Sequence, residues 1–423
     1  MTCAPRSLRL PFARFALSGF LAVALAAGAR AKELREIFDG LYGGDRTITL
    51  LVNGGPPHAG DFDASKGLKT FRGITRAIAG IPSNLPVDSS SASFTYDINP
   101  ATGVPERVTT DGLGPMLVQR AQTLGQFRLN TAFVWTRLEH RTIDGREIDD
   151  LRSVAPLKDV PGGQFAFEQD YLDLRIRVRA IEDVFAYIFT FGVTDWMDIN
   201  AVILTVNVDL KVEARAMLHD GGRGVHGFDP TPGRVVAPNT SPTDPAVDGA
   251  EDSAFGMGDT LLRLKVKPLD AIFRTSHPPL SDYFQFALLA QMRLPTGDVD
   301  NLLGSEYENY RLLAIFSQTF GGFFEPHVNL GYKFSVQAGG HDVFLYSAGF
   351  AIRCVSWLTV FADVNGRKEE VVAKSATDIV DLLVGFKVNP FEDFVLGVNF
   401  LVPLNEQGLR TDFAPSVGLE YTF

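Results

Sequence analysis

Apolar and polar side chains alternate along much of the chain. The clearest case is the C-terminal segment 409–423, where the odd positions are almost all apolar and the even positions are polar or very small. Segments 324–336 and 202–218 repeat the pattern. Because successive side chains of a β-strand point to opposite faces, a period of two predicts strands with one apolar and one polar face.

Segments of this kind recur after residue 90. They begin near Ala92, Val108, Phe127, Leu174, Val202, Thr260, Tyr283, Tyr310, Phe324, Phe344, Leu358, Val380, Phe394 and Leu409. Most contain an uncharged band of about nine to eleven residues, the length of a tilted strand that crosses a bilayer. No segment after residue 31 has the roughly 18 uninterrupted apolar residues of a membrane helix. The pattern predicts an all-β fold, a transmembrane antiparallel outer-membrane β-barrel of about 14 strands, with about 12 as the alternative number.

The connections between these segments differ in length at the two predicted ends. If the C-terminus is periplasmic, the two longest connections, 142–169 and 219–254, point outward, whereas 320–323 and 389–393 are tight periplasmic turns. Long outer loops and short inner turns are typical of outer-membrane barrels. The long connection 269–281 does not fit this asymmetry, and the pattern offers no explanation for it.

The chain before the first predicted strand divides into two parts. Residues 1–31 contain early arginines, an apolar run at 15–29 and the ending Ala-Arg-Ala, which predict a secretory signal peptide, with an uncleaved signal anchor as the alternative. Residues 32–90 are rich in Gly, Pro and Ser and do not alternate. We expect them to plug the lumen, to hang in the periplasm or to form a loosely ordered leader. Residues 91–423 are the predicted barrel.

Composition narrows the possible partners. The chain has 50 acidic and 39 basic residues, a net charge of −11, which argues against binding to nucleic acid. Its 45% hydrophobic content excludes intrinsic disorder, and two cysteines cannot build a disulfide framework or a thiolate metal site. The expected partners are outer-membrane lipid and a small-molecule solute. Nothing in the sequence indicates an oligomeric state.

Four short motifs resemble a known family. They are Phe191-Gly192-Val193-Thr194-Asp195, Gly256-Met257-Gly258-Asp259, Leu294-Pro295-Thr296-Gly297-Asp298 and His327-Val328-Asn329-Leu330-Gly331-Tyr332. In order and spacing they resemble the outer-membrane transporters associated with the meta-cleavage pathway of phenol degradation, which are related in architecture to the long-chain fatty-acid transporter barrels. The first motif departs from the family pattern by having Phe where Tyr is usual. The resemblance covers roughly residues 90–423 and implies passage of small, often hydrophobic or aromatic, compounds across the outer membrane. It carries over no substrate site.

Motifs for catalysis or cofactor binding are missing from the sequence. Gly256-x-Gly258 lacks the third glycine and the helix of a dinucleotide loop, and no phosphate-binding loop or zinc-protease motif is present. The seven histidines are scattered rather than spaced as metal ligands. We therefore predict no catalytic residue, metal or cofactor. His327 is the one candidate base for an alternative activity, an outer-membrane hydrolase, although a hydrogen-bonded lumen histidine is the preferred interpretation.

Charged side chains gather on the face opposite the predicted lipid face. Strand phase places these basic residues in the lumen: Arg175, Arg177, Arg179, Lys211, Arg215, Arg263, Lys265, Lys267 and Arg293. The far wall carries Asp363, Asp381, Asp412 and Glu420. A basic arc facing an acidic arc orders polar solutes in porin-like channels, and here it favours hydrophobic solutes that bear a carboxylate or phenolate. The alternative is that opposite charges pair across neighbouring strands and close the lumen.

In segment 174–191, positions of the same parity carry charged residues in one half and aromatic residues in the other. Its aromatic residues Phe185, Tyr187, Phe189 and Phe191 have the same parity as the three arginines at 175–179. We expect either a β-bulge near Glu182-Asp183 or aromatic side chains that fill the lumen.

The sequence thus favours an outer-membrane channel or transporter of a Gram-negative bacterium. A structural or adhesive barrel with a closed lumen is the second interpretation, a hydrolase the third and a soluble exported β-protein the fourth.

Overall fold

The structure of the protein is a computed structural model. It describes residues 33–38, 49–52, 58–59, 74–75, 77–80, 93–98, 105–107, 112–156, 171–219, 226–228, 246–272, 285–335, 342–369, 377–391 and 393–423. The predicted signal peptide and most of segment 32–90 lie outside these residues. In the part of the chain that is described, no helix is long and apolar enough to cross a membrane.

Twelve of the described strands form a closed antiparallel barrel. They are β5 (Leu129–Ile143), β8 (Tyr171–Thr194), β9 (Met197–His219), β11 (Ala246–Val266), β12 (Gln285–Leu294), β13 (Asn309–Ser317), β14 (Phe324–Ser335), β15 (Val343–Val355), β16 (Leu358–Glu369), β17 (Thr377–Phe391), β18 (Phe394–Pro403) and β20 (Ala414–Thr422). The ring closes because β5 pairs with β20 on one side and with β8 on the other. Every strand of the ring therefore has two hydrogen-bonded neighbours, as a membrane barrel requires.

Smaller elements are not strands of this ring. The strands β6 (Arg146–Glu147), β7 (Leu151–Pro156) and β19 (Leu409–Thr411) add to its sheet. Two further sheets are β10 (His226–Phe228) with β1 (Thr49–Val52) and β2 (His58–Ala59), and β3 (Tyr96–Ile98) with β4 (Pro105–Arg107). The helical elements are η1 (Leu34–Glu36), α3 (Pro268–Ile272) and the helical residues 74–75 and 77–80.

The barrel has the alternative number of strands, twelve, rather than the fourteen segments counted from the sequence. The two extra segments, near Ala92 and Val108, contain β3 and β4, which pair with each other over three residues each. Three residues are too few to cross a bilayer. The predicted loop 219–254 is also shorter than expected, because β11 already begins at Ala246.

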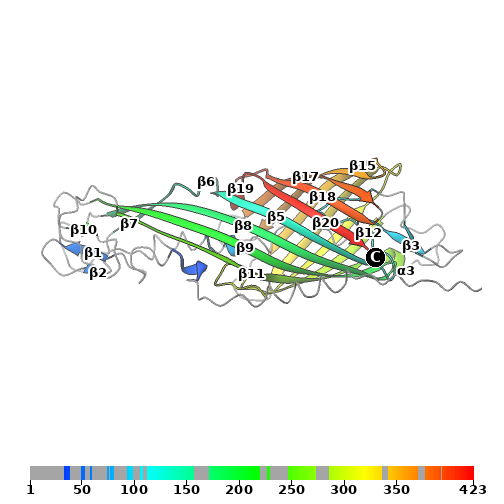
Figure 1. Ribbon diagram of the computed structural model, residues 1–423, viewed down its shortest axis with the longest axis horizontal. Coiled ribbons are helices and arrows are strands. Elements are labelled where there is room, and N and C mark those ends of the chain that lie inside the picture. The colour runs from blue at the N-terminus through cyan, green and yellow to red at the C-terminus, as the bar shows by residue number, and fades with distance from the viewer. Residues whose placement is uncertain are drawn as a thin grey trace, which may run out of the picture. The chain divides into compact units, whose positions relative to one another are not determined.

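Three strands are much longer than the others. β8, β9 and β11 have 24, 23 and 21 residues, whereas the remaining barrel strands have 9 to 15. At a rise of about 3.4 Å per residue, β8 spans roughly 80 Å, more than twice the thickness of a hydrocarbon core of about 30 Å. Figure 1 shows these three strands running well past the ends of their neighbours. Their far halves therefore extend beyond the membrane.

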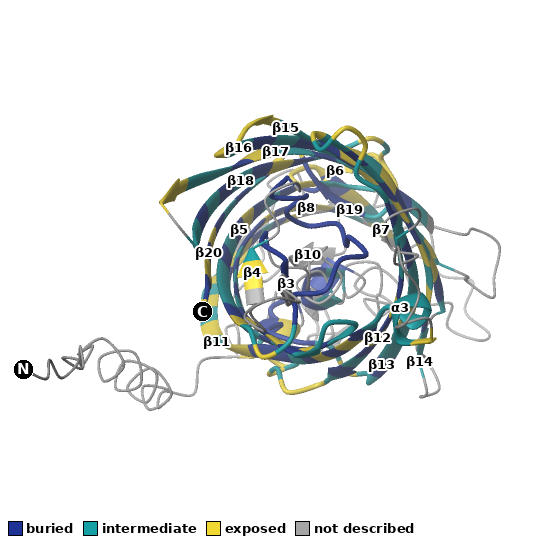
Figure 2. Ribbon diagram, turned by 90° about the vertical axis from the view of Figure 1, so that its right-hand side faces the viewer, coloured by how far each residue is buried: buried dark blue, intermediate teal, exposed yellow. Residues whose placement is uncertain are grey.

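Across β12 to β20 the outer face is mainly apolar, and the inner face carries most of the polar side chains together with some apolar ones. Leu288, Leu312 and Leu330 are exposed on the outer face, while Gln291, Asn329 and Ser416 are buried on the inner face. This burial confirms the phase predicted for 324–336 as far as residue 335 and the phase predicted for 409–423 from residue 413 onward, whereas Leu409 and Thr411 are buried rather than outward. Figure 2, which looks along the barrel, shows the alternation of buried and exposed residues around the ring. Soluble proteins do the reverse, so the exposed apolar band identifies a surface that meets lipid.

Strand β8 has neither the bulge nor the lumen aromatics that the sequence suggested. Its pairing with β9 is continuous from Tyr171 to Gly192 and passes Glu182 without a shift. Phe189 and Phe191 are exposed on the outer face, and so are Arg175, Arg177 and Arg179. The two groups share one face because the aromatic half crosses the membrane and the arginine half projects into water.

A β-bulge occurs instead in β11. Pairing with β9 shifts between Met257 and Thr260, so the two residues Gly258 and Asp259 lie opposite the single residue Leu204 and β11 gains one extra residue. Such a bulge reverses which residues of a strand face inward. After it, the inward residues are Leu261, Arg263 and Lys265, all of which are buried.

Candidate functional site: the lumen of the barrel

The connection between β12 and β13, residues 295–308, is held inside the barrel by Asp259. The fully buried carboxylate of Asp259 accepts hydrogen bonds from the backbone N–H groups of Gly297 (3.3 Å) and Ser305 (3.1 Å) and from the Ser305 hydroxyl (2.9 Å). Arg293 Nε lies 3.8 Å from the same carboxylate. The bulge in β11 thus aims one acidic side chain at a neighbouring loop and anchors it at two points. We call residues 295–308 the inner loop.

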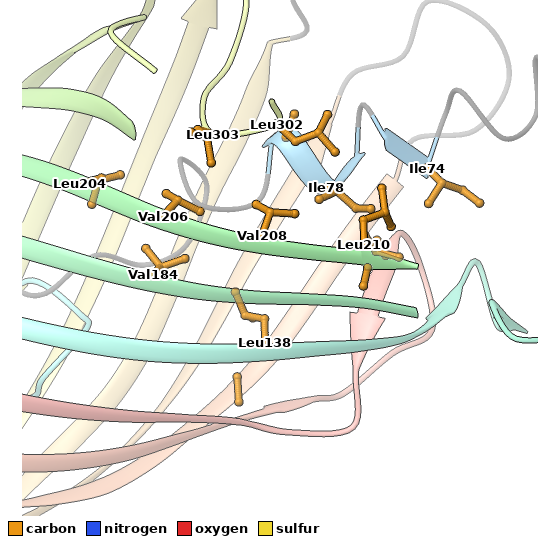
Figure 3. Packing of buried hydrophobic residues seen from close by; sticks show 14 of the residues in the cluster. Ile74, Ile78, Leu138, Val184, Leu204, Val206, Val208, Leu210, Leu302 and Leu303 are labelled. Atoms are coloured by element: carbon orange, nitrogen blue, oxygen red, sulfur yellow. The ribbon is translucent and has the colours of Figure 1, made fainter. Parts of the chain in front are cut away.

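The tip of the inner loop enters the barrel interior. Leu302 and Leu303 are buried among inward-facing residues of β9, and Figure 3 shows them on the same side of that strand as Val206. A Cβ atom at Gly256 would come within 2.8 Å of Leu303 Cδ1, and one at Gly258 would come within 3.0 Å of Leu204 Cβ. These glycines leave the room that the loop occupies. The G-x-G-D and L-P-T-G-D motifs, which begin 38 positions apart, are therefore two halves of one contact.

Parts of the N-terminal segment also lie in the interior. Arg35 N–H donates to Asp300 O (2.9 Å) of the inner loop, and the Arg35 guanidinium pairs with Glu306 at 2.5 Å. Ile74 and Ile78 are buried, and Figure 3 shows them beside Leu210 of β9. These contacts agree with the lumen interpretation of residues 32–90 at the described positions, and the bounds of that segment stay a prediction.

Residues 112–126, which we call the floor segment, are attached to the inner wall around the barrel. Three backbone N–H groups of the floor segment donate to wall side chains. They are Leu113 N to Thr359 Oγ1 (3.0 Å), Ala121 N to Ser317 Oγ (3.0 Å) and Leu124 N to Asp198 Oδ2 (3.0 Å). These partners belong to β16, β13 and β9, so one irregular segment is tied to opposite sides of the ring. Figure 2 shows buried irregular chain inside the strands.

Buried charges add to this attachment. The Arg120 guanidinium lies 3.5 Å from the Glu325 carboxylate, and both side chains are almost completely buried. Lys265 Nζ donates to the backbone carbonyls of Arg120 (3.2 Å) and Gln122 (3.3 Å). A buried ion pair is costly to break because each partner is left without compensation. The prediction of a barrel strand that begins near Val108 was therefore wrong for the floor segment, which lies in the lumen.

A pocket lies between the floor segment and the wall formed by β11 to β16. Three arginines from three strands line it, Arg263, Arg311 and Arg367. The remaining described lining is neutral polar or apolar, with Gln119, Gln291, Asn329, Ser347, Asn365, Leu117, Val118, Leu289, Leu313, Leu345 and Tyr346. Its described lining therefore contains basic groups and no carboxylate. We call this pocket the lumen chamber.

The structure separates the nine basic residues predicted for the lumen into four groups. Arg263 and Arg293 lie at the lumen chamber or next to it, and Lys265 holds the floor segment. Lys267 follows the end of β11 and forms an ion pair with Asp270 of α3. The role of these residues in solute passage stays a prediction.

The other five basic residues were assigned to the wrong face. Arg175, Arg177, Arg179, Lys211 and Arg215 are exposed, while their neighbours along each strand are buried. The Lys211 ammonium lies 3.4 Å from Glu251 and 3.6 Å from Glu213 on the outer face. The prediction took the apolar face of β8 and β9 to be the lipid face everywhere. That face is instead the inner one in both halves of β8 and β9, and beyond the membrane water surrounds the charged residues of the outer face.

The predicted acidic wall is neutralised locally. His327 Nε2 lies 2.6 Å from Asp363, Arg410 donates to Asp381 at 2.6 Å, and Lys387 Nζ lies 3.7 Å from Glu420. Asp412 is mostly exposed. On this wall the geometry agrees with the alternative interpretation, in which opposite charges pair with one another. In the part of the chain that the structure describes, no group of three or more potential ligands could hold a metal ion.

Sequence reasoning missed Arg311, Lys333 and Arg367 as a group. Each alternates with outward apolar residues in its own strand, and that parity was the available signal. Register brings them together, because Arg311 pairs with Lys333 in β14, and Arg367 lies two strands further on.

Comparison with known proteins gives one family and several solved structures. Residues 161–343 match the model of a family described as "Putative MetA-pathway of phenol degradation". An outer-membrane channel from Pseudomonas putida F1 is similar over 72% of this chain and 98% of its own, with 9% identity and a TM-score of 0.41. The toluene transporter TbuX of Ralstonia pickettii is similar over 71% and 90%, with 9% identity and a TM-score of 0.33. No curated protein matches the chain. Over residues 161–343, the family resemblance indicated by the motifs is confirmed.

Proposed function

We propose that the protein is a channel in the outer membrane of a Gram-negative bacterium, exported by its signal peptide, and that it passes small hydrophobic or aromatic compounds. The observation that carries the proposal is the closed barrel with an apolar outer face and an amphipathic chamber inside. An apolar exterior suits lipid, whereas a chamber with leucines and arginines suits solutes that are neither purely apolar nor fully hydrated. The match to a phenol-degradation family supports aromatic solutes.

A solute that crosses the lumen has to pass the floor segment. Its bonds to Thr359, Ser317 and Asp198 span the ring, and the Arg120–Glu325 ion pair holds it from a fourth strand. Weakening this attachment should widen the path without removing the wall. Glu325→Gln removes one charge of the buried pair and is therefore expected to increase conductance.

The test is conductance in planar bilayers together with uptake of phenol into proteoliposomes. We expect steady channels from the natural protein and larger ones from Glu325→Gln. Glu213→Gln, which removes an equal charge from the exposed outer face, should behave as the natural protein does. Electrical silence of all three proteins, with phenol uptake equal to that of empty liposomes, would contradict the proposal.

A structural or adhesive barrel is the second candidate, and one observation favours it. The projecting halves of β8 and β9 carry Arg175, Arg177 and Arg215 beside Asp149 and Glu213, a charged surface outside the membrane. Binding of cells or matrix by the protein, lost on deletion of this projection in a barrel that conducts no solute, would support that function.

A further inference from the structure

We propose that the lumen chamber binds a small amphipathic anion, an aromatic monocarboxylate, with Arg311 at the centre of the site and Arg263 and Arg367 beside it. The inference deepens the proposed function, on which it rests for the entry of solutes into the barrel. It concerns what the chamber recognises rather than whether the barrel conducts.

The first argument is the charge around Arg311. Its side chain faces inward from β13, with Arg263, Arg293 and Arg367 near enough to repel it and Lys333 on the adjacent strand. No described residue hydrogen-bonds or ion-pairs with the Arg311 side chain, and its buried Nε has no partner among the residues that the structure describes. Burying a guanidinium among like charges is unfavourable unless an anion is close. The site is therefore electrostatically incomplete as the described protein forms it.

The second argument is that the nearby carboxylates are engaged elsewhere. Asp259 holds the inner loop and faces Arg293, and Asp381 is bonded to Arg410 at 2.6 Å. Asp363 is bonded to His327. Each of these contacts has a structural role in the wall or loop. Asp381 and Glu369 attract Arg367, whereas the charged groups that act on Arg311 are all basic.

The third argument is the shape of the lining, which determines the class of anion. Leu117 and Val118 of the floor segment and Leu313 and Leu345 of the wall form apolar surface beside the arginines. A guanidinium binds a carboxylate through two parallel hydrogen bonds, and leucine side chains favour an apolar ring. A ligand with a carboxylate at one end and an aromatic ring at the other satisfies both. Asn329 and Asn365 can donate further hydrogen bonds to its oxygen atoms.

The experiment compares two probes that share a ring. Benzoate carries a carboxylate, whereas benzyl alcohol is neutral, and binding of each to the full-length protein in detergent is measured by titration calorimetry. We expect benzoate to bind at least tenfold more tightly than benzyl alcohol, and its affinity to fall as salt is raised. Arg311→Gln should weaken benzoate binding about tenfold or more and leave benzyl alcohol unchanged.

The matched control is Arg179→Gln, which removes the same charge from the exposed outer face of β8. It should bind benzoate as the natural protein does. Equal affinity of the natural protein for the two probes, or equal benzoate affinity of Arg311→Gln and the natural protein, would overturn the inference. Heat-modifiable gel migration establishes that each variant is folded. If Arg311→Gln does not fold, the inference is tested by Arg367→Gln in its place and by the affinities of the natural protein for the two probes.

Failure of this inference is distinguishable from failure of the proposed function. A barrel that conducts and takes up phenol but does not prefer benzoate keeps the function and loses the site. A barrel that binds benzoate through Arg311 but conducts nothing keeps the site and loses the channel.

Discussion

The two halves of β8 and β9 share a mainly apolar, buried inner face and differ in what their outer face carries. In the membrane half, Phe189, Phe191 and Ile199 point outward to lipid. In the projecting half, Ile176 and Leu210 are buried inward, and Arg177 and Lys211 point outward. The strands continue without changing direction, so the surroundings of the barrel and not the strand pattern decide which residues are acceptable outside. Alternation identifies two faces, and the surroundings of the barrel determine which side chains its outer face carries.

The boundary between the halves can be placed on β8. The Asp183 carboxylate accepts hydrogen bonds from Trp135 Nε1 (3.0 Å) and from Arg137 (3.2 Å) on the outer face of β5. A tryptophan with a polar partner beside an arginine is typical of the interface between lipid and water. Aromatic residues 185–191 lie on one side of this contact and arginines 175–179 on the other.

The largest effect should come from charging the inner face of the projecting half. Val208 is completely buried in the cluster that includes Ile74, Ile78 and Leu302. Val208→Asp places a carboxylate without a partner in that cluster, and we expect it to lower the free energy of unfolding by about 3 to 5 kcal/mol. Urea titration followed by heat-modifiable migration measures the change. Asp209→Asn, one residue along on the exposed face, is the control and should shift stability by less than about 0.5 kcal/mol.

The next effect tests the two outer faces by exchanging their residue types. Leu330→Arg puts a charge on the lipid face and should cost about 2 to 4 kcal/mol near the bilayer midplane. Arg177→Leu puts a leucine on the projecting outer face and should cost no more than about 0.5 kcal/mol. Unfolding from lipid vesicles by denaturant measures both. Equal costs for the two exchanges would show that the halves share one environment.

A smaller effect is expected where the bulge anchors the inner loop. Asp259→Asn keeps the shape of the side chain but removes the charge that accepts from Gly297 and Ser305, and should cost about 1 to 3 kcal/mol. Release of the loop exposes residues 295–308 to protease and increases conductance, because Leu302 and Leu303 leave the lumen. Asp298→Asn, within the loop but not bonded to β11, should leave conductance unchanged.

The smallest effect is expected outside both halves, at the hairpin β3–β4. Tyr96 donates a hydrogen bond to Asp393 (2.8 Å), and burial, followed by this hydrogen bond, raises the pKa of the Tyr96 phenol. Tyr96→Phe should cost about 0.5 to 1.5 kcal/mol at neutral pH. Because the folded-state pKa is the higher one, this contribution is complete below the ordinary tyrosine pKa of about 10 and declines as pH rises above it. Denaturant titrations of both proteins at pH 7 and pH 11 measure the difference, and a constant difference would contradict the assignment.

Part of the candidate site could be read from the sequence. Arg263 and Arg293 lie on strands whose parity places them opposite outward leucines, and they are found at the chamber or beside it. Arg175 and Lys211 have an equally clear parity and were assigned to the wrong face. Parity alone does not distinguish them, because strand length beyond the membrane is what differs. The floor segment has no periodic pattern, and its position depends on hydrogen bonds to residues up to 246 positions away.

The sequence by itself determined the class of fold, since alternation over bands of bilayer length leaves a closed barrel as the arrangement that satisfies the backbone in lipid. It also marked the glycines and the aspartate of the bulge as special, without showing why. Only the tertiary structure decided which face of each long strand is inner, which segment crosses the lumen and which arginines share a chamber. The physical reason is that alternation depends on consecutive residues of the chain. Whether a side chain contacts water, lipid or another charge depends on residues far apart in the sequence that folding brings together.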